Sequence, residues 1–446
     1  MAKSEKKEIP TAPKGMRDFI GDEHHKYQGF FEKAAEIALY YGFQPIETPT
    51  MEREDVFIAT NSEDTDLVGK EMYSLKTKGG DKLALRPEGT APVMRAYLEH
   101  GMQTLPQPVK LYYYGSFFRH DNPQRGRYRE LKQFGMEMIG VQKAIADAMV
   151  IYLTAMILKE VGIDNIVIDI NSIGDKESRT PYLRELTAYY RKHLNHLCAD
   201  CKQRIKANPM RILDCKHAQC QPFKEKAPQT IAHLSPDAKR HFKEVLEYLD
   251  ALKLNYRINT NLVRGLDYYT HTVFEITELP TENTKAETEE ETDAKKKEEP
   301  ATPLTIAGGG RYDYLAKRLG SKKDVPAMGV GMGVDRILMS PNYKTVQPRI
   351  VKKPKIYFIQ LGFEAKLKSL EVIEILRNAR IPVTHSLTKD GLSAQLAIAE
   401  KMGIPYALIF GQKEALEGTV IIREMLTRSQ ETVKIAKLAD HIKAMK

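Results

Sequence analysis

The chain has 446 residues, and its 68 lysines and arginines against 59 aspartates and glutamates give a formal net charge of +9. That length is enough for two or three domains with cores of their own. No apolar run reaches the roughly eighteen residues that a membrane span needs, so we expect no membrane partner. The basic surplus is compatible with a polyanionic partner but does not prove one. A charged N-terminus without an apolar export signal, together with only four cysteines, predicts a cytoplasmic protein with reduced thiols.

The first part of the chain predicts an α+β core. Residues 1–10 are a polar leader that we expect to be disordered, and a helical pattern follows from Asp22 to Tyr41. Prolines interrupt the next short strand, which favours an edge position. Further strands and helices are predicted at Lys82–Arg86, Ala91–His100, Val109–Phe118, Phe134–Val141, Ile145–Val161 and Asn165–Ile170. Several of the strands follow one another without a βαβ rhythm, so residues 11–174 and 256–340 predict a mostly antiparallel sheet with flanking helices.

The remaining segments differ in character. Residues 175–255 are helical and rich in lysine, histidine and cysteine, which predicts an inserted helical domain. Residues 280–300 hold eight acidic residues, four lysines and no large apolar residue, so we expect a disordered loop within the core. Residues 341–353 read as a linker. Residues 354–446 alternate strands (KIYFIQL, RIPVTHSL, PYALIFG, GTVIIREML) with helices, which predicts a separate small α/β domain.

The segment LVRGLDYYTHTVFE, at 262–275, is an apolar, β-branched run that predicts a strand. It contains Arg264, and an arginine buried in a strand is costly unless it meets an anion. The partner is either a carboxylate of the same segment, Asp267 or Glu275, or the phosphate of a ligand. The segment alone leaves both open.

A second cationic segment, GSFFRHDNPQRGRYRELKQFGMEMIG, spans residues 115–140. Two apolar strands flank a loop with four arginines, at positions 119, 125, 127 and 129. Arg119 stands beside Phe117 and Phe118 within the strand, which suggests a buried anion. The tip, NPQRGRYR, suits contact with a phosphate backbone, and a solvated hairpin face is the alternative.

Three further segments carry candidate ligand-binding residues. Glu88 and Thr90 stand where a strand becomes a helix, so they either cap that helix or bind a substrate ammonium. AGGGRYDYL, at 307–315, has three glycines that permit a close approach of backbone and ligand. GVGMGVDR, at 329–336, follows no βαβ unit and is no dinucleotide fingerprint. Its glycines would let a strand pass close to a nucleotide, with Arg336 placed for a terminal phosphate.

These segments together resemble the class II aminoacyl-tRNA synthetases and, among them, the histidyl-tRNA synthetase family. The resemblance rests on a helix and proline-containing strand at 34–49, the arginine-bearing hairpin at 115–140 and the glycine-rich strand and helix at 329–338. LVRGLDYY at 262–269 and GGGRYD at 308–313 are signatures of the histidine family. The match covers nearly the whole chain, including INSIGD before the insertion and an anticodon-binding-like domain at 354–446.

The resemblance implies an enzyme that attaches L-histidine to its tRNA through a histidyl-adenylate, with ATP and Mg²⁺. It implies that Arg119 and Arg264 are catalytic at the α-phosphate, that Arg336 contacts the γ-phosphate and that Leu131 lies under the adenine. Leu131 replaces an aromatic residue common in the family, so it gives apolar contact without ring stacking. Fixed cations in a dry pocket are a strong way to stabilise the charge that builds on phosphoryl oxygens.

The implied histidine pocket pairs both nitrogens of a neutral imidazole, which rejects mismatched ligands strongly. Glu137 and Tyr269 would hold the ring. The remaining implied contacts to histidine are Glu88, Gly89, Thr90, Arg119, Gln133, Arg264, Tyr268 and Tyr312. Candidates for the end of the tRNA are Gln124, Arg125 and Arg127. The resemblance also implies a homodimer.

The four cysteines, Cys198, Cys201, Cys215 and Cys220, have the spacing C-x₂-C-x₁₃-C-x₄-C within the insertion, with His193, His196 and His217 nearby. This spacing resembles a structural zinc site. The second pair is looser than C-x₂-C, and the family is not generally a zinc enzyme. We therefore expect no resident metal, with zinc at these cysteines as the alternative.

Two other functions compete with the enzyme. One is a catalytically inactive synthetase-like regulatory subunit of histidine biosynthesis, and the other is a tRNA-binding scaffold without catalysis. Retention of Arg119, Arg264 and residues 354–446 argues against the first of them.

Overall fold

The computed structural model describes residues 9–60, 65, 67–122, 125–279, 304–349, 354–386 and 390–445. The chain folds into two compact units, Met1–Pro348 and Arg349–Lys446. The predicted acidic loop at 280–300 lies outside the described residues, as do residues 1–8 of the predicted leader and 350–353 of the predicted linker. Among the described residues, no helix is both long and apolar enough to cross a membrane.

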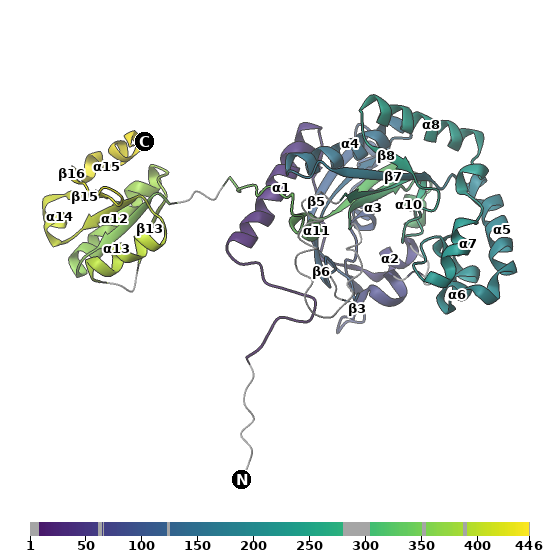
Figure 1. The fold of residues 1–446 in the computed structure, drawn as a ribbon, viewed down its shortest axis with the longest axis horizontal. Helices are drawn as coiled ribbons and strands as arrows, with labels where there is room; N and C mark the ends of the chain where they lie inside the picture. Colours follow the sequence, from purple (N-terminus) through teal and green to yellow (C-terminus); the bar gives the residue numbers. More distant parts are fainter. Residues whose placement is uncertain are drawn as a thin grey trace, which may run out of the picture. The chain divides into compact units, whose positions relative to one another are not determined.

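The first unit is built on an eight-stranded sheet (Figure 1). Its spatial order is β1 (Gln44–Pro45), β5 (Val109–Phe118), β6 (Glu130–Ile139), β11 (Ala327–Gly333), β10 (Thr305–Arg311), β9 (Thr270–Glu278), β7 (Ile166–Ser172) and β8 (Tyr256–Ile258). From β5 to β7 every neighbouring pair is antiparallel, and only the two edge pairs, β1–β5 and β7–β8, are parallel. The predicted α+β class and mostly antiparallel sheet are confirmed, and the proline-containing strand β1 lies at an edge.

The two faces of this sheet bury different cores, because successive strand residues point to opposite sides. Phe134, Met136 and Met138 of β6 pack on one face against α1 (Asp22–Tyr40), α4 (Ala144–Glu160) and α8 (Pro236–Ala251). On the other face the core contains tyrosines 113, 268, 269 and 312, with side chains from α3 (Thr90–Glu99) and α5 (Lys176–Lys192). This second face carries the candidate site.

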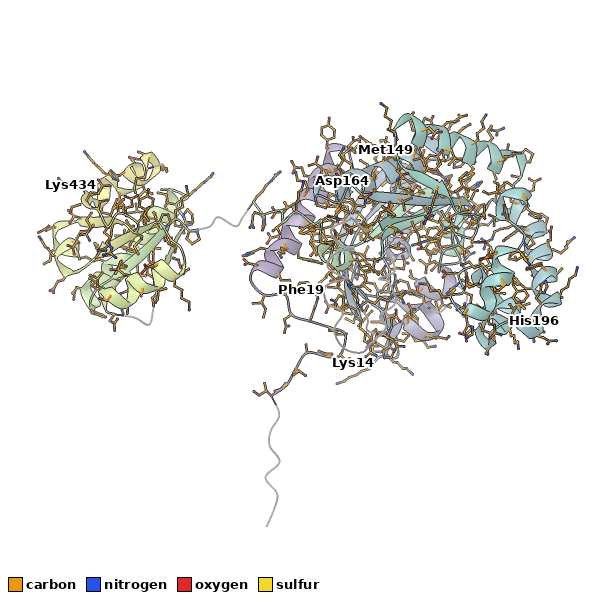
Figure 2. All side chains as sticks on the ribbon, in the orientation of Figure 1. Lys14, Phe19, Met149, Asp164, His196 and Lys434 are labelled. Atoms are coloured by element: carbon orange, nitrogen blue, oxygen red, sulfur yellow. The ribbon has the colours of Figure 1, made fainter. Side chains whose placement is uncertain are left out.

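Smaller elements complete the first unit. A three-stranded sheet has the order β2 (Met51–Arg53), β4 (Lys82–Leu85) and β3 (Tyr73–Lys76). Short helices are α2 (Glu54–Thr60), the π-helix η1 (Leu67–Glu71), the 3₁₀ helix η2 (Met102–Thr104), α10 (Leu315–Arg318) and α11 (Val334–Leu338). Before α1, the Arg17 guanidinium lies over Phe19, which Figure 2 labels.

Between β7 and β8 every assigned element is helical. After α5 these are η3 (Leu194–His196), α6 (Ala199–Ala207), η4 (Pro209–Ile212), η5 (Ala218–Cys220), α7 (Gln221–Glu225), η6 (Thr230–His233) and α8. All of them belong to the first compact unit, and α8 packs against α4. The assignment of residues 175–255 to a domain of their own remains a prediction.

The second unit has a five-stranded sheet with the order β13 (Val383–His385), β12 (Ile356–Gln360), β14 (Tyr406–Phe410), β15 (Thr419–Glu424) and β16 (Gln430–Lys434). Strands β13, β12 and β14 are parallel, whereas β15 and β16 run antiparallel. The helices are α12 (Phe363–Asn378), α13 (Leu392–Lys401), α14 (Gln412–Glu417) and α15 (Ile435–Ala444). Of the strands, the sequence did not predict β16, which is polar except for the buried Val433.

Candidate functional site

A cavity of about 490 Å³ opens on the second face of the large sheet. It collects residues from segments more than 200 positions apart in the chain, which the topology of the sheet brings together. The predicted site residues that line it are Glu88, Gly89, Thr90, Arg119, Arg127, Leu131, Gln133, Arg264, Tyr268, Tyr269 and Arg336. Glu137 and Tyr312 are buried and lie outside the lining. Arg125 is exposed outside the lining, and Gln124 lies outside the described residues.

The segment that carries Arg264 is not the strand that its composition predicts. No strand is assigned at 262–269, where residues 265–268 form bends and turns, and β9 begins only at Thr270. The backbone carbonyls of Gly265 and Asp267 accept hydrogen bonds from the side chains of Arg211 and Arg318 rather than from a neighbouring strand. Tertiary contacts therefore override β propensity here. The prediction of a strand from 262 was wrong for its first eight residues.

Arg264 has both an internal anion and an open nitrogen. Its Nη1 donates to Glu275 Oε1, so the carboxylate partner that the sequence left open is present. Its Nε is buried and has no hydrogen-bond partner among the described residues. Burial lowers the pKa of Arg264, but the Glu275 carboxylate together with Tyr269 and Tyr268 outweighs it, and the net shift of the pKa is upward. Arg264 is therefore a fixed cation that still has a donor to offer.

The triple glycine of β10 makes room for Arg264 and Tyr269. A Cβ on Gly308 would lie 2.6 Å from Arg264 Nη1, and a Cβ on Gly310 would lie 2.8 Å from Tyr269 Cδ1. Both distances are below normal contact. The close approach predicted for these glycines is made by two side chains of the protein itself. Of the three glycines, Gly308 lines the cavity.

Two more arginines face the cavity from other elements. Arg119 follows β5 directly, and its Nε donates to the carbonyl of Pro87 at 2.8 Å. Arg336 of α11 donates from Nε to Gly126 O at 2.9 Å and from Nη1 to Thr305 O at 2.6 Å. Burial lowers the pKa of Arg336, and repulsion from Arg127 and Arg119 lowers it further. Cations that repel one another in a shared cavity suit a ligand with several negative charges.

Carboxylates gather at another part of the cavity. Glu88 accepts hydrogen bonds from the backbone N–H groups of Thr90 (2.6 Å) and Ala91 (3.0 Å), so it caps α3. It also accepts from the Tyr268 hydroxyl at 3.3 Å and lines the cavity. The capping alternative is thus present, and it does not exclude a ligand. Burial raises the pKa of Glu88, although the two backbone donors and Arg119 act against it.

Glu137 lies immediately behind this part of the lining and is fully buried. It accepts hydrogen bonds from the hydroxyls of Thr90 (2.8 Å), Tyr113 (3.3 Å) and Tyr312. Burial raises the pKa of Glu137 to about 8, since these neutral donors lower it by less than burial raises it. The register of β6 places Glu137 opposite Gly329, where a Cβ would lie 1.6 Å from its Oε2. A glycine is therefore required beside this carboxylate.

Sequence reasoning missed several residues of the lining. Tyr113 of β5 donates to Glu137 and packs its ring where a Cβ on Gly89 or Gly135 would clash, at 2.3 and 2.2 Å. The glycine within strand β6 was the available signal for such a close approach. Asp214 and Lys216 reach the cavity from the helical segment between β7 and β8. Nothing in their own sequence indicates a site.

Arg311 of the GGGRYD segment has a structural role. It is fully buried, and its Nε donates to Asp147 Oδ1 at 3.0 Å. Its Nη1 donates to Asp313 at 3.2 Å and to the carbonyl of Val141 at 2.8 Å. With these partners Arg311 binds the glycine-rich strand to α4, away from the cavity lining.

Comparison with known proteins identifies this arrangement. Residues 15–337 match the family model described as Histidyl-tRNA synthetase, and residues 355–445 match the one described as Anticodon binding domain. The chain is 39% identical over 432 residues to a Histidine–tRNA ligase from Dehalococcoides mccartyi, covering 97% of this chain and 99% of that protein. It is also 39% identical over 433 residues to a Histidine–tRNA ligase from Caldicellulosiruptor saccharolyticus, with coverage of 97% and 99%.

Among solved structures, apo S. aureus histidyl-tRNA synthetase aligns with a TM-score of 0.78 and 28% identity, over 98% of this chain and all of that one. The fold is therefore that of a class II aminoacyl-tRNA synthetase, with an antiparallel core sheet and a separate C-terminal α/β unit. Within that class, the chain belongs to the histidyl-tRNA synthetase family.

Proposed function

We propose that this protein attaches L-histidine to its cognate tRNA through a histidyl-adenylate made from ATP. Membership of the histidyl-tRNA synthetase family supports the reaction. The observation that carries it is a single cavity lined by Arg119, Arg264 and Arg336 and by the buried Glu88, with Glu137 directly behind the lining. Among the described residues, the Nε of Arg264 has no hydrogen-bond partner, and the hydrogen bonds of Glu88 and Glu137 come from backbone N–H groups and hydroxyls. Histidine and ATP together supply groups of the matching kind, an ammonium for Glu88, an imidazole for Glu137 and phosphates for the arginines.

In the first step the histidine carboxylate attacks the α-phosphorus of ATP, and pyrophosphate leaves. Negative charge builds on the phosphoryl oxygens, and preorganised cations in a water-poor site stabilise that charge without having to reorganise. Arg264, with its open Nε, and Arg119 are the proposed catalytic residues at the α-phosphate. Arg336 is proposed for the γ-phosphate and Leu131 for the adenine.

The proposed histidine pocket is the carboxylate part of the cavity. Glu88, Thr90 and Gln133 line it and would hold the α-ammonium group. For the imidazole, Tyr269 lies in the lining, whereas Glu137 is reached once the Thr90 or Tyr113 hydroxyl yields its hydrogen bond. Tyr268 and Tyr312, whose ring centres lie 5.9 Å apart, enclose this end.

Mg²⁺ is proposed to accompany ATP. Hard divalent cations prefer oxygen ligands, and the carboxylates of Glu71, Asp121 and Glu275 line the same cavity. Arg125 and Arg127 are proposed contacts to the end of the tRNA. The unit that matches the Anticodon binding domain is proposed to read the anticodon. A cytoplasmic location is proposed from the four free thiols.

A homodimer is also proposed. The implied interface, residues 34–49, contains the end of α1 and the edge strand β1. Tyr40 and Leu39, adjacent on this stretch, are 85% and 49% exposed, and neighbouring exposed apolar side chains suit a protein–protein contact. Sedimentation of the wild type and of a Leu39→Glu, Tyr40→Glu variant tests this. A wild-type monomer at micromolar concentration would refute it.

ATP–pyrophosphate exchange with each of the twenty standard amino acids tests the proposed function. Only histidine should support exchange, and Arg264→His should abolish it. Arg240→His is the matched control, because Arg240 is an exposed arginine of α8 outside the cavity lining. Exchange with no amino acid would refute the enzyme and favour the regulatory subunit or the scaffold.

A further inference from the structure

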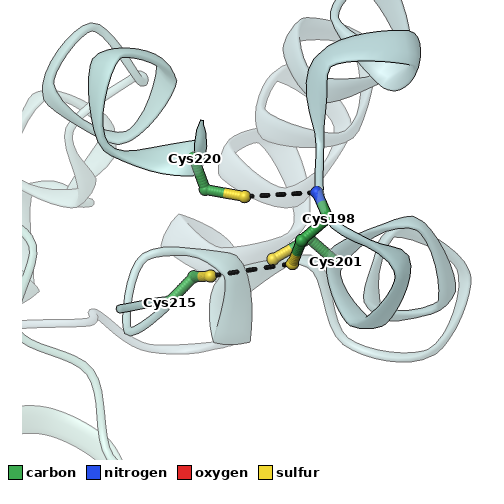
Figure 3. A group of neighbouring side chains, drawn as sticks. All are labelled: Cys198, Cys201, Cys215 and Cys220. Carbon is green, nitrogen blue, oxygen red and sulfur yellow. Dashed lines mark hydrogen bonds between the residues drawn. The ribbon is translucent and has the colours of Figure 1, made fainter. Parts of the chain in front are cut away.

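The four cysteines of the chain converge in the helical segment between β7 and β8 (Figure 3). Their sulfur atoms all lie within 4.8 Å of one another. They come from separate elements: Cys198 precedes α6, Cys201 lies within α6, Cys215 follows η4 and Cys220 ends η5. Three are buried and Cys198 is half-buried. All four have free thiols.

We infer that these cysteines form a tetrathiolate site for Zn²⁺. A tetrahedral zinc with Zn–S bonds of about 2.3 Å has sulfur atoms about 3.8 Å apart, and Cys198 Sγ lies 3.9 Å from Cys215 Sγ. The backbone N–H of Cys198 also donates to Cys220 Sγ at 3.4 Å, a contact that favours a thiolate. Soft thiolate ligands select Zn²⁺ over the hard cations.

The histidines near these cysteines in sequence are not ligands of this site. Among the described residues, the ligand atoms that converge here are the four sulfurs alone. His193 and His196 instead pack against the ring of Phe223, with ring centres 4.9 and 5.5 Å away. A closed set of four protein ligands is the pattern of structural zinc sites, whereas catalytic sites keep an open position.

The surroundings explain why a metal is useful there. The assigned elements of residues 194–225 are 3₁₀ turns and two short helices, α6 and α7. Helices of this length are marginal by themselves and depend on tertiary contacts. A metal bound by all four cysteines would link α6, the turn after η4 and the end of η5 directly.

The same segment reaches the substrate cavity. Cys215 stands between Asp214 and Lys216, which both line the cavity. Asn208 Nδ2 donates to Asp267 Oδ1 at 2.5 Å, and Arg211 Nη1 donates to the carbonyl of Gly265 at 3.1 Å. Both acceptors belong to the turn that carries Arg264. The metal site therefore positions that turn, and this second part of the inference rests on the proposed function.

Metal content tests the site itself, independently of catalysis. Wild-type protein should contain about one equivalent of zinc, or take it up after chelation when Zn²⁺ and a thiol reductant are added. Cys198→Ala should lose it and Cys198→His should keep it, because imidazole is also a zinc ligand. Asp200→Asn, an exposed change between two of the ligands, is the control that keeps zinc. Less than a tenth of an equivalent in reduced, Zn²⁺-treated wild type overturns the inference.

Hydrogen exchange and kinetics test the coupling. Removal of zinc should raise amide exchange in residues 194–225 and 262–269, but not in the second unit, Arg349–Lys446. It should lower kcat/KM for histidine-dependent pyrophosphate exchange about ten- to a hundred-fold, and added Zn²⁺ should restore it. Unchanged exchange at 262–269 together with unchanged kinetics would overturn the coupling. Wild type that binds zinc but shows no pyrophosphate exchange would instead refute the proposed function alone.

Discussion

Two fully buried carboxylates of the first unit, Asp147 and Glu137, have opposite surroundings. Asp147 of α4 accepts hydrogen bonds from Arg311, from His241 at 2.8 Å and from Thr272 at 2.7 Å. Burial raises the pKa of Asp147, but the Arg311 charge and His241 outweigh it and lower the pKa to about 2. The hydrogen-bond donors to Glu137 among the described residues are hydroxyls, and burial raises its pKa to about 8.

The surroundings of Asp147 are those of a cluster that stabilises the fold, whereas the surroundings of Glu137 suit a cluster that binds a ligand. The Asp147 cluster contains its own cation, so burial of the charge is balanced within the protein. The Glu137 cluster has no cationic partner among the described residues and lies beside a cavity. The arginines repeat the contrast, since every nitrogen of Arg311 has a partner, whereas the Nε of Arg264 has none within the described part of the chain. Complete pairing of polar groups within the protein, rather than burial, thus distinguishes the structural residues from those of the candidate site.

The largest expected effect on stability comes from removing Arg311 from the Asp147 cluster. Arg311→Met removes the cation and leaves Asp147 buried without its charge partner. Loss of one member of a buried ion pair costs about 3–5 kcal/mol of unfolding free energy. Urea unfolding of the first unit measures it, with the exposed Arg240→Met as the matched control. A loss of unfolding free energy below about 1 kcal/mol, the range of surface ion pairs, would contradict the stabilising role of the Asp147 cluster.

Arg264→Gln should lower catalytic turnover strongly and stability only slightly, whereas Arg311→Met should lower stability. Removal of one fixed donor to a developing oxyanion lowers turnover about 10²–10³-fold, so kcat for pyrophosphate exchange should fall by that factor. Urea unfolding should change far less than in Arg311→Met, because Glu275 keeps a hydrogen bond from Thr305 at 3.2 Å and is partly exposed. An Arg264→Gln protein that is strongly destabilised but retains wild-type kcat would make Arg264 a structural residue.

The two carboxylates should respond to pH in opposite directions. Folded Glu137 retains a proton that the unfolded chain releases, so its contribution to stability is present in acid and is lost as the pH rises through about 8. The slope is at most about 1.4 kcal/mol per pH unit. Asp147 contributes stability above the ordinary range of its pKa, and this is lost as the pH falls toward about 2. Both signs follow from which state binds more protons.

Glu137→Gln isolates the first of these effects. Between pH 6 and pH 8 the urea midpoint should fall less in the variant than in the wild type, and the exposed Glu244→Gln should follow the wild type. Equal pH dependence in Glu137→Gln and wild type would show that Glu137 is ionised in the free protein. Histidine-dependent exchange should be impaired in the variant at every pH, because glutamine offers a different donor and acceptor pattern.

The sequence predicted the long strands of the sheet because they are apolar or β-branched runs, although the predicted strand at Phe134–Val141 begins four residues after the start of β6 at Glu130. Val109–Phe118 was predicted with the bounds that β5 has, and the parity of Leu131, Gln133 and Glu137 on β6 was right. The prediction from the sequence failed where tertiary contacts determine the local structure. The turn at 262–269 has the composition of a strand, but side chains from 54 and 51 residues away take up its carbonyls.

Tertiary contacts also explain why parts of the candidate site could not be predicted from the sequence. Which carboxylate pairs with Arg264 depends on the register of β9, which composition does not specify. Asp214 and Lys216 reach the cavity only because the segment that contains the four cysteines folds back toward it. Resemblance to a family supplied the roles of residues. The difference between the Asp147 cluster, which contains Arg311, and the Glu137 cluster, which has no cation among the described residues, depends on the folded arrangement of distant segments.

The smallest expected effect concerns the loop after β5, where one arginine has a carboxylate partner and a nearby arginine has none among the described residues. Arg127 donates to Asp121 at 3.1 Å and lines the cavity. Arg125 is exposed and has no partner among the described residues. Arg125→Ala should therefore weaken tRNA binding a few-fold and reduce the magnitude of the slope of log K against log salt by about one, because one phosphate contact is lost. Filter binding across a salt series measures this. Histidine-dependent pyrophosphate exchange, which needs no tRNA, should stay at the wild-type rate, and a matching loss there would place Arg125 with the ATP-binding arginines instead.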